Sequence, residues 1–188
     1  SENMKSLDRV LQRWRIAKAR PFITDGARVL DIGSSDGALF QQLGRRLGGG
    51  VGIDPTLRQN GRVDNFSLIA GRFPQDMPSV PAFDVITMLA VLEHFPQAGY
   101  ASLRSGCSRF LKPGGHLIIT VPSRQVDFIL KVLLALGLID GMSVEEHHGY
   151  DVRETANIFP PPEFKLVKRQ RFQLGLNNLF VFERQGEA

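Results

Sequence analysis

Short apolar runs alternate with segments of helical spacing over the first 125 residues. Leu7, Val10, Leu11, Trp14 and Ala17 recur at helical spacing and predict an amphipathic helix that ends near Pro21. The apolar runs predict buried strands, and the segments between them predict two further helices. The strands are expected at 27–33, 50–54, 66–71, 83–92 and 116–121, the helices at 37–47 and 96–110, and a turn at 111–115.

The last third of the chain has a different pattern. Residues 128–138 are strongly apolar and predict a helix, whereas 140–162 are polar, contain proline and show no clear period. Residues 164–172 and 177–184 predict an antiparallel hairpin. Strands separated by helices favour parallel βαβ units, so we expect an α/β fold with a doubly wound, Rossmann-like sheet. The sheet would be mostly parallel, with the C-terminal hairpin antiparallel and helices on both faces.

At about 150 residues per domain, a chain of 188 residues is expected to form one domain, 1–188. Its parts would be an N-terminal helix, a cofactor-binding core, an apolar helix with an acceptor-side lid, and the hairpin. These parts are expected at 1–22, 28–123, 124–162 and 163–184.

Composition narrows the setting of the protein. One cysteine, Cys107, excludes an internal disulfide and a multi-cysteine zinc site, and it fits a reducing compartment. The longest apolar stretch, 128–139, is too short to span a bilayer, and no signal peptide precedes Asp31. We therefore expect a soluble cytoplasmic protein without a transmembrane segment.

The positive charge of the chain is unevenly distributed. The net charge is +4, and the first 20 residues, with six cationic and two acidic side chains, account for all of it. Lys165, Lys168, Arg169 and Arg171 form a second basic group in the predicted hairpin. A solvated helix face and an edge strand protected by cations explain both groups. Nucleic acid or anionic lipid is the alternative interpretation.

The end of the first predicted strand carries the motif Asp31-Ile-Gly33-Ser34-Ser35-Asp-Gly37. Ligands of doubly wound sheets bind beyond the carboxyl ends of the strands, and glycines there let the backbone approach a ligand closely. The turn lacks the G-x-G-x-x-G of nicotinamide sites. Its acid suits a cationic amino group better than a pyrophosphate, and Asp54, ending the second strand, can accept both hydroxyls of a ribose. The pattern indicates an adenosine ligand without phosphates.

The segments VLDIGSSDGALF, GVGID, FDVITMLAVLEHF and LKPGGHLIITVPS, in this order and spacing, resemble class I S-adenosylmethionine-dependent methyltransferases. The likeness is greatest to the small-molecule branch that includes quinone-biosynthesis enzymes, and it covers 28–123. It implies S-adenosylmethionine as cofactor and S-adenosylhomocysteine as product. By position, it implies that the methionine part of the cofactor contacts Asp31 and the turn residues Gly33, Ser34, Ser35 and Gly37. It implies that the ribose contacts Asp54 and Pro55, and that the adenine contacts Gly71, Arg72 and Phe73. Met88, Leu89 and Ala90 would lie beneath the sulfonium.

Two residues depart from the family pattern. Ser35 occupies the place of the middle glycine of D-x-G-x-G-x-G, which adds a side chain where backbone often approaches the ligand. Arg72 occupies a place that is commonly acidic, and arginine cannot accept the hydrogen bond of the adenine amino group. Adenine recognition would then use backbone, stacking, or another residue such as Asp76.

Methyl transfer to an O or N–H acceptor requires removal of a proton. We expect His94, which has Glu93 beside it, or His147 or His148, to be the general base, with Tyr150 as an orienting hydroxyl. Glu93 and His94 can instead cap the next helix, and 145–148 can form a solvated turn. A metal site at 145–148 would be weak because no second cluster of ligands accompanies it, so no metal is expected.

The acceptor is expected to be a small organic molecule, hydrophobic or lipid-linked. The N-P-P-Y tetrapeptide of base-methylating enzymes is replaced by Met88-Leu89-Ala90-Val91, so DNA is not an expected partner. The apolar helix at 128–138 has more apolar surface than sheet packing requires. The alternatives are an RNA- or protein-directed methyltransferase that uses the basic N-terminal helix, and a non-catalytic protein of the same fold.

Overall fold

The fold is built on a twisted sheet with the strand order β3-β4-β2-β1-β5-β6-β8-β7. A computed structural model describes residues 2–123 and 150–186 of the chain. The strands are β1 (Arg28–Ile32), β2 (Gly49–Asp54), β3 (Gly61–Val63), β4 (Phe66–Ala70), β5 (Phe83–Leu89), β6 (Leu111–Pro122), β7 (Phe164–Phe172) and β8 (Asn177–Arg184). The central strands β4, β2, β1, β5 and β6 are parallel, β3 is antiparallel at one edge, and β8 and β7 form an antiparallel hairpin at the other. The predicted fold class is confirmed.

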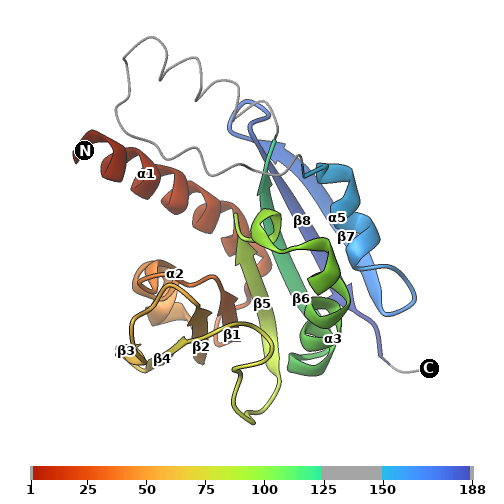
Figure 1. The fold of residues 1–188 in the computed structure, drawn as a ribbon, viewed down its shortest axis with the longest axis horizontal. Helices are drawn as coiled ribbons and strands as arrows, with labels where there is room; N and C mark the ends of the chain where they lie inside the picture. Colours follow the sequence, from red (N-terminus) through yellow and green to blue (C-terminus); the bar gives the residue numbers. More distant parts are fainter. Residues whose placement is uncertain (1, 124–149, 187–188) are drawn as a thin grey trace.

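Helices cover both faces of this sheet (Figure 1). The helices α1 (Glu2–Ala19) and α2 (Ala38–Leu43) bury apolar side chains in a core cluster on one face. On the other face, α3 (Tyr100–Phe110) and α5 (Thr155–Ile158) bury theirs in a second cluster. Short 3-10 turns join these elements: η1 (Arg20–Phe22), η2 (Gly44–Arg46), η3 (Leu92–His94), η4 (Gln97–Gly99) and η5 (Val152–Glu154).

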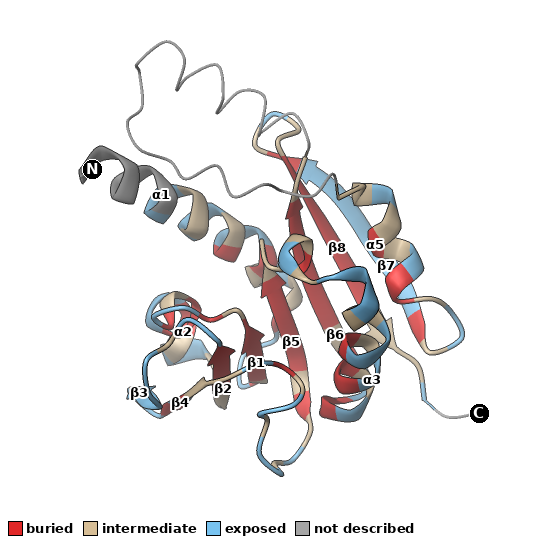
Figure 2. Ribbon diagram, in the orientation of Figure 1, coloured by how far each residue is buried: buried red, intermediate tan, exposed pale blue. Residues whose placement is uncertain are grey.

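Burial along the strands explains their sequence pattern. The central strands β1, β5 and β8, and β6 from Gly115 onward, are mostly buried because helices cover both of their faces (Figure 2). Strand β7 differs, since only its end residues Phe164 and Phe172 are buried and the seven residues between them are exposed. The hairpin therefore places an exposed, cation-rich strand at the edge of the sheet.

The structure departs from the predicted elements in four places. The strand predicted at 83–92 ends at Leu89, and Leu92 begins η3. The strand β3 was not predicted because its three residues are too few to show a period. Residues 111–115 belong to β6 instead of forming a separate turn: Leu111 pairs with Phe83 and His116 already pairs with Val85, so the intervening residues bulge out of the ladder. The polar segment contains η5 and α5, and the predicted helix at 128–138 lies outside the described residues.

The chain order places a topological switch point between β1 and β5. From β1 the chain proceeds to β2 and β4 on one side, then crosses to β5 on the other side. Connections leave in opposite directions at this point, which opens a crevice beyond the carboxyl ends of the strands. The carboxyl end of β1 is Asp31-Ile32, so the predicted cofactor motif lies at the crevice.

Candidate cofactor site at the carboxyl ends of the strands

Asp31 occupies the end of β1 directly beside Thr87 of β5, its register partner. The Thr87 hydroxyl donates a 2.7 Å hydrogen bond to Oδ1 of Asp31, and both side chains are buried. Burial disfavours the ionised carboxyl and raises the pKa of Asp31 from 3.8 to about 7; the Thr87 hydrogen bond lowers it and the charge of Asp54 raises it. A cationic ligand group beside this carboxyl would favour its charged form.

The turn after β1 brings backbone close to β2. Gly33 has φ +76° and its N–H donates to the Ile53 carbonyl at 2.8 Å. A side chain at this position would meet Val91, whose Cγ2 would lie 2.3 Å from the added Cβ. Ser35 also has a positive φ, +48°, so a non-glycine residue adopts the left-handed conformation where the family pattern has glycine.

Asp54, at the end of β2, holds this turn in place. Its Oδ2 accepts the N–H of Ser35 at 2.8 Å, and its Oδ1 accepts both the N–H and the hydroxyl of Thr56, at 2.8 and 2.6 Å. A carboxylate has about four acceptor positions, and three of them are occupied here. Asp54 lines neither of the two cavities at the strand ends, although its neighbours Ile53 and Pro55 line the larger one. The predicted ribose acid therefore also has a structural role.

A cavity of about 320 Å³, the Asp31 cavity, lies between the β1 turn and α1. Ser34 lines it, and its Oγ is buried and has no hydrogen-bond partner among the described residues. Such a hydroxyl is costly to bury unless a ligand or water bonds to it. The remaining lining comes from Arg9, Gln12, Arg15 and Ile16 of α1, from Asp31, Gly33, Ser35, Asp36 and Leu39, and from Leu89 and Ala90 after β5.

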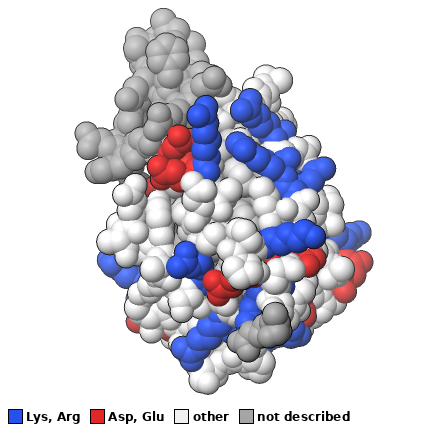
Figure 3. Space-filling model, turned by 90° about the vertical axis from the view of Figure 1, so that its right-hand side faces the viewer, with Lys and Arg blue, Asp and Glu red and all other residues white. Residues whose placement is uncertain are grey.

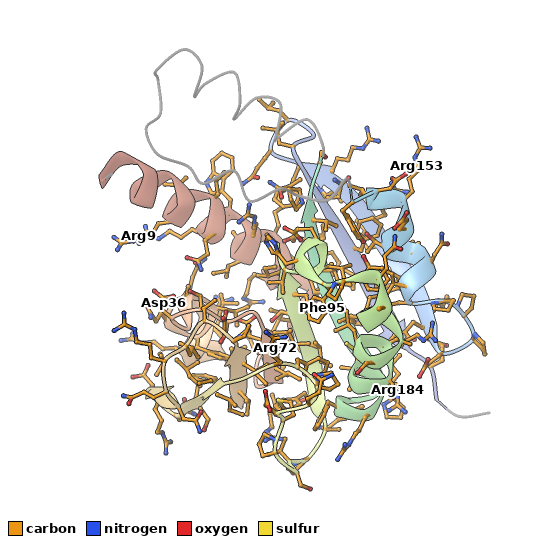
Figure 4. All side chains as sticks on the ribbon, viewed as in Figure 1. Arg9, Asp36, Arg72, Phe95, Arg153 and Arg184 are labelled. Carbon is orange, nitrogen blue, oxygen red and sulfur yellow. The ribbon has the colours of Figure 1, made fainter. Side chains whose placement is uncertain are left out.

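The arginines of α1 are the residues that sequence reasoning missed at this site. Arg9, Gln12 and Arg15 follow one another at three-residue spacing, so they share a face of the helix. That spacing was visible in the sequence, but which face α1 turns toward the strand ends was not. In Figure 4, Arg9 and Asp36 lie at one side of the strand ends, and Arg72 and Phe95 lie nearer the middle of the molecule.

A larger cavity of about 630 Å³, the Phe73 cavity, continues from Gly33 in the other direction. Its side chains are mainly apolar, with Arg72, Gln75, His94 and Ser102 as the polar exceptions. The described residues that line it are Ile32, Gly33, Ile53, Pro55, Arg72, Phe73, Gln75, Val91, His94, Phe95, Pro96, Gly99 and Ser102. The predicted adenine residues Arg72 and Phe73 are therefore brought together with Pro55.

The carboxylate of Asp76 is used by the backbone. Its Oδ2 accepts the Arg72 N–H at 2.7 Å, and a side chain at Gly71 would lie 2.6 Å from Asp76 Cβ. Asp76 does not line the Phe73 cavity, and neither does Gly71. Asp76 thus fixes the loop after β4 through the backbone of Arg72, without lining the cavity itself.

Helix α3 supports the Phe73 side chain from behind. Phe73 is 6% exposed and packs against Phe110, with ring centroids 5.9 Å apart. A methyl group at Gly106 would lie 2.6 Å from Pro74 Cβ and 2.8 Å from Phe73 Cε1. The absence of a side chain at Gly106 lets α3 approach this close.

The residues at the end of β5 and directly after it differ in their contact with the two cavities. Leu89 and Ala90 line the Asp31 cavity, whereas the Met88 side chain is fully buried in the core and lines neither cavity. Ala90 has φ +57°, and its N–H donates to the carbonyl and hydroxyl oxygens of Thr120 at 2.9 and 3.0 Å. These bonds hold the chain where it leaves the strand.

Of the four predicted catalytic residues, the described part of the chain contains His94 and Tyr150. His94 ends η3, is exposed and lines the Phe73 cavity, while Glu93 is half-buried. Tyr150 lines neither cavity: its hydroxyl lies 2.6 Å from Thr155 Oγ1 of α5, and burial raises its pKa. His147 and His148, and the weak metal cluster at 145–148, lie outside the described residues.

The sequence model of the methyltransferase-domain family matches residues 4–166. A ubiquinone biosynthesis O-methyltransferase of Pseudomonas aeruginosa is 33% identical over 111 residues, which cover 53% of this chain and 46% of that protein. The corresponding enzyme of Ralstonia nicotianae is 29% identical over 135 residues, covering 66% and 56%. The chain thus spans about half the length of these curated relatives.

Solved structures share the fold at low sequence identity. The N-methyltransferase NodS from Bradyrhizobium japonicum WM9 in complex with S-adenosyl-L-homocysteine has a TM-score of 0.64 and 18% identity, covering 94% of this chain and 88% of that one. The 1,6-didemethyltoxoflavin-N1-methyltransferase of Burkholderia thailandensis has a TM-score of 0.68 and 16% identity, covering 96% and 80%. At these identities the likeness concerns the fold. Among the described residues, no helix is long and apolar enough to cross a membrane.

Proposed function

Because this chain belongs to the methyltransferase-domain family, we propose that it transfers the methyl group of S-adenosylmethionine to an oxygen or nitrogen atom of a small organic acceptor. The product would be S-adenosylhomocysteine. The observation that carries the proposal is the buried Asp31 carboxyl, whose pKa of about 7 shows the cost of its burial as an anion. A ligand with a cationic amino group would offset that cost.

The Asp31 cavity suits the amino-acid end of this cofactor. Asp31 would bind the amino group, and the buried Ser34 hydroxyl would gain a hydrogen-bond partner. Arg9 and Arg15, which line the same cavity, would supply positive charge for the carboxylate. Both charges of a zwitterion would thus meet an opposite charge.

The Phe73 cavity suits the adenosine end. The remaining acceptor position on Asp54 Oδ2 would accept a ribose hydroxyl. The apolar walls around Phe73 and Pro55 offer surface for the faces of a purine ring. Arg72 can donate but not accept, so the adenine amino group would rely on backbone carbonyls or water.

When bound, S-adenosylmethionine supplies a methyl group that its sulfonium has activated for in-line displacement. The residues of the chain then have to position the oxygen or nitrogen atom of the acceptor about 3–3.5 Å from that methyl group. They also have to accept the proton that this acceptor atom loses. We assign the proton to His94, His147 or His148, and an orienting hydrogen bond to Tyr150. The position of His94 on the wall of the Phe73 cavity supports its candidacy.

The acceptor class follows from the nature of the relatives and of the site. The curated relatives are named for O-methylation in ubiquinone biosynthesis, and a structural neighbour for N-methylation of a toxoflavin precursor. Apolar side chains predominate on the wall of the Phe73 cavity, which is consistent with an apolar acceptor. We therefore propose an aromatic or quinone-like acceptor that carries a hydroxyl or ring nitrogen.

Titration calorimetry with S-adenosylmethionine, S-adenosylhomocysteine and NAD tests the cofactor assignment. We expect both sulfur compounds to bind and NAD not to bind. Binding of NAD alone, or of none of the three, would contradict the proposal. Mass spectrometry of phenolic and N-heteroaromatic acceptors should then show a methyl-group mass increase, and single His94→Ala, His147→Ala and His148→Ala variants should identify the base. Unchanged turnover in all three would remove the histidine assignment.

A further inference from the structure

The fold brings together the two basic segments that lie at opposite ends of the sequence. A groove of about 630 Å³ runs between α1 and β7, with Trp14 and Lys18 on one wall and Lys168 and Arg171 on the other. Its other lining residues are Ala17, Pro21, Phe22, Gln170, Phe172 and Gln173, so no acidic side chain of the described residues lines it. Among the described residues, neither Lys18 nor Lys168 nor Arg171 forms an ion pair.

The exposed large apolar side chains of the described residues are found on these same elements. They are Val10 and Trp14 on α1, Leu166 and Val167 on β7, and Leu174 at the tip of the hairpin. Trp14 is 54% exposed and Leu174 is fully exposed. Val10 and Trp14 are four residues apart in α1, so they share a face of that helix with Ala17 and Lys18.

Side chains along a strand alternate between the two faces of the sheet, so Lys168 faces the groove whereas Arg169 lies 5.2 Å from the Phe180 ring on the other face. Cationic and apolar side chains therefore surround the exposed edge that β7 forms. Strand β7 carries Lys165, Lys168, Arg169 and Arg171 and no acid. In Figure 3, which shows the side of the molecule that carries β7, Lys and Arg side chains gather in the upper right part of the view. We call α1, β7 and the hairpin tip, with the groove between them, the basic–apolar surface.

We propose that the basic–apolar surface docks on a membrane that contains acidic phospholipids. The cations would lie against the lipid headgroups, each adding about fivefold to the affinity near the surface. Trp14 and the exposed aliphatic side chains would enter the interface, where tryptophan is favoured because its ring is amphipathic. This proposal is independent of the proposed methyl transfer.

A single-stranded nucleic acid is the main competitor for a basic surface. Such ligands stack their bases on a series of exposed aromatic side chains. In the described residues, Trp14 is the only aromatic among the exposed large apolar side chains, and the other four are aliphatic. Aliphatic side chains cannot stack with bases but do insert between lipids, which favours the membrane.

Trp14 is the only tryptophan of the chain, so its fluorescence reports on this surface alone. The full chain is mixed with vesicles of phosphatidylglycerol and phosphatidylcholine, with vesicles of phosphatidylcholine only, with inorganic phosphate, and with a single-stranded RNA. We expect the phosphatidylglycerol vesicles to shift the emission to the blue and to carry the protein upward in a flotation gradient. We expect neither effect with phosphatidylcholine alone or with phosphate.

Charge reversal provides a matched comparison. Lys168→Glu with Arg171→Glu should weaken flotation with the anionic vesicles at least tenfold. Arg45→Glu with Arg46→Glu makes the same change of charge on η2, at exposed positions outside the groove, and should leave flotation within about twofold, the attenuation that salt screening allows for distant charges. Equal losses in the two double variants would overturn the proposal.

Two other outcomes would also overturn it. Binding to RNA with quenching of Trp14 and no response to vesicles would assign the surface to nucleic acid. A response to phosphate alone that equals the response to vesicles would reduce it to a small anion site. Circular dichroism of each variant, compared with the unmodified chain, separates loss of binding from loss of folding.

Discussion

The Asp31 cavity and the Phe73 cavity share Gly33 but are built from different chemistry. The first is polar and has charges of both signs, with Asp31 opposite Arg9 and Arg15. The second is about twice as large and mainly apolar, and Arg72 stands where an acceptor for adenine is commonly found. The comparison supports the proposal that charge would fix one end of the cofactor and that shape and apolar contact would hold the other.

Among the substitutions considered, replacing Asp31 should have the largest effect on cofactor affinity, because it removes the negative charge of the Asp31 cavity. Asp31→Asn retains the shape and the Thr87 contact but removes the negative charge, so we expect S-adenosylmethionine to bind at least about 100-fold more weakly. At pH 8 the same variant should unfold at a higher temperature, because it no longer buries an ion whose cost is about 2–4 kcal/mol. Calorimetry measures the first effect and thermal unfolding the second.

The control for Asp31→Asn is Asp64→Asn, an exposed acid in the turn between β3 and β4. Asp64→Asn should change neither the affinity for S-adenosylmethionine nor the midpoint of thermal unfolding. Cofactor affinity that survives Asp31→Asn would show that charge does not fix this end of the ligand.

The pH should act through the same carboxyl. The pKa of Asp31 is raised to about 7 in the folded protein, so the stability linked to its proton is complete below pH 4 and is lost as the pH rises through 7. Cofactor binding has the opposite dependence, because a cation favours the ionised form. We expect affinity to rise about tenfold from pH 6 to pH 8 and then to level off.

Calorimetry across this pH range should show proton release on binding, and the release should be absent in Asp31→Asn. A flat affinity profile for the unmodified chain would show that Asp31 is already ionised throughout the range.

Replacing Arg72 with a hydrogen-bond acceptor should give the Phe73 cavity a polar contact for adenine, as the Asp31 cavity has for the amino group. Arg72→Gln adds an amide oxygen that can accept from the adenine amino group, without adding a charge beside Asp76. We expect about 3- to 10-fold tighter binding of S-adenosylhomocysteine, the value of one hydrogen bond of about 1 kcal/mol. Arg72→Met, of similar length but without an acceptor, is the matched control, and equal gains in both variants would assign the effect to loss of the guanidinium.

Substitution of Ser35 should have the smallest effect, a small change in the stability of the fold. Its φ of +48° is unfavourable for serine, so Ser35→Gly should raise stability by at most about 1 kcal/mol, or about 2–4 °C in midpoint. The N–H that donates to Asp54 is retained in this variant. Ser35→Ala keeps the strain and removes the hydroxyl, so its midpoint should stay within about 1 °C of the unmodified chain. A lower midpoint for Ser35→Gly would mean that the serine side chain stabilises the turn.

Much of the sheet could be predicted because local patterns determine it. Buried central strands appear as continuous apolar runs, and helices that pack on one face appear at helical spacing, as in α1. The bulge in β6 could not be foreseen, because Pro113, Gly114 and Gly115 are typical of a turn and only the pairing of Leu111 and His116 with β5 on either side of them makes them part of one strand.

The candidate site was predictable where a residue belongs to a strand end, as Asp31 and Asp54 do. It was not predictable where the assignment depends on how elements meet in space. Arg9 and Arg15 belong to the site only because α1 turns that face toward the β1 turn. Asp76 was a candidate adenine ligand by sequence proximity, but its carboxylate is bonded to the Arg72 backbone.

The close approach of α3 to Phe73 means that the depth of the Phe73 cavity is set by a residue that does not line it. Any side chain at Gly106 would push the Phe73 ring toward the cavity or force α3 away from the sheet. Ligand selectivity can therefore change through a helix position that faces away from the ligand. A comparison of related chains that considers only the residues on the cavity wall would miss the effect of position 106 on the volume of the cavity.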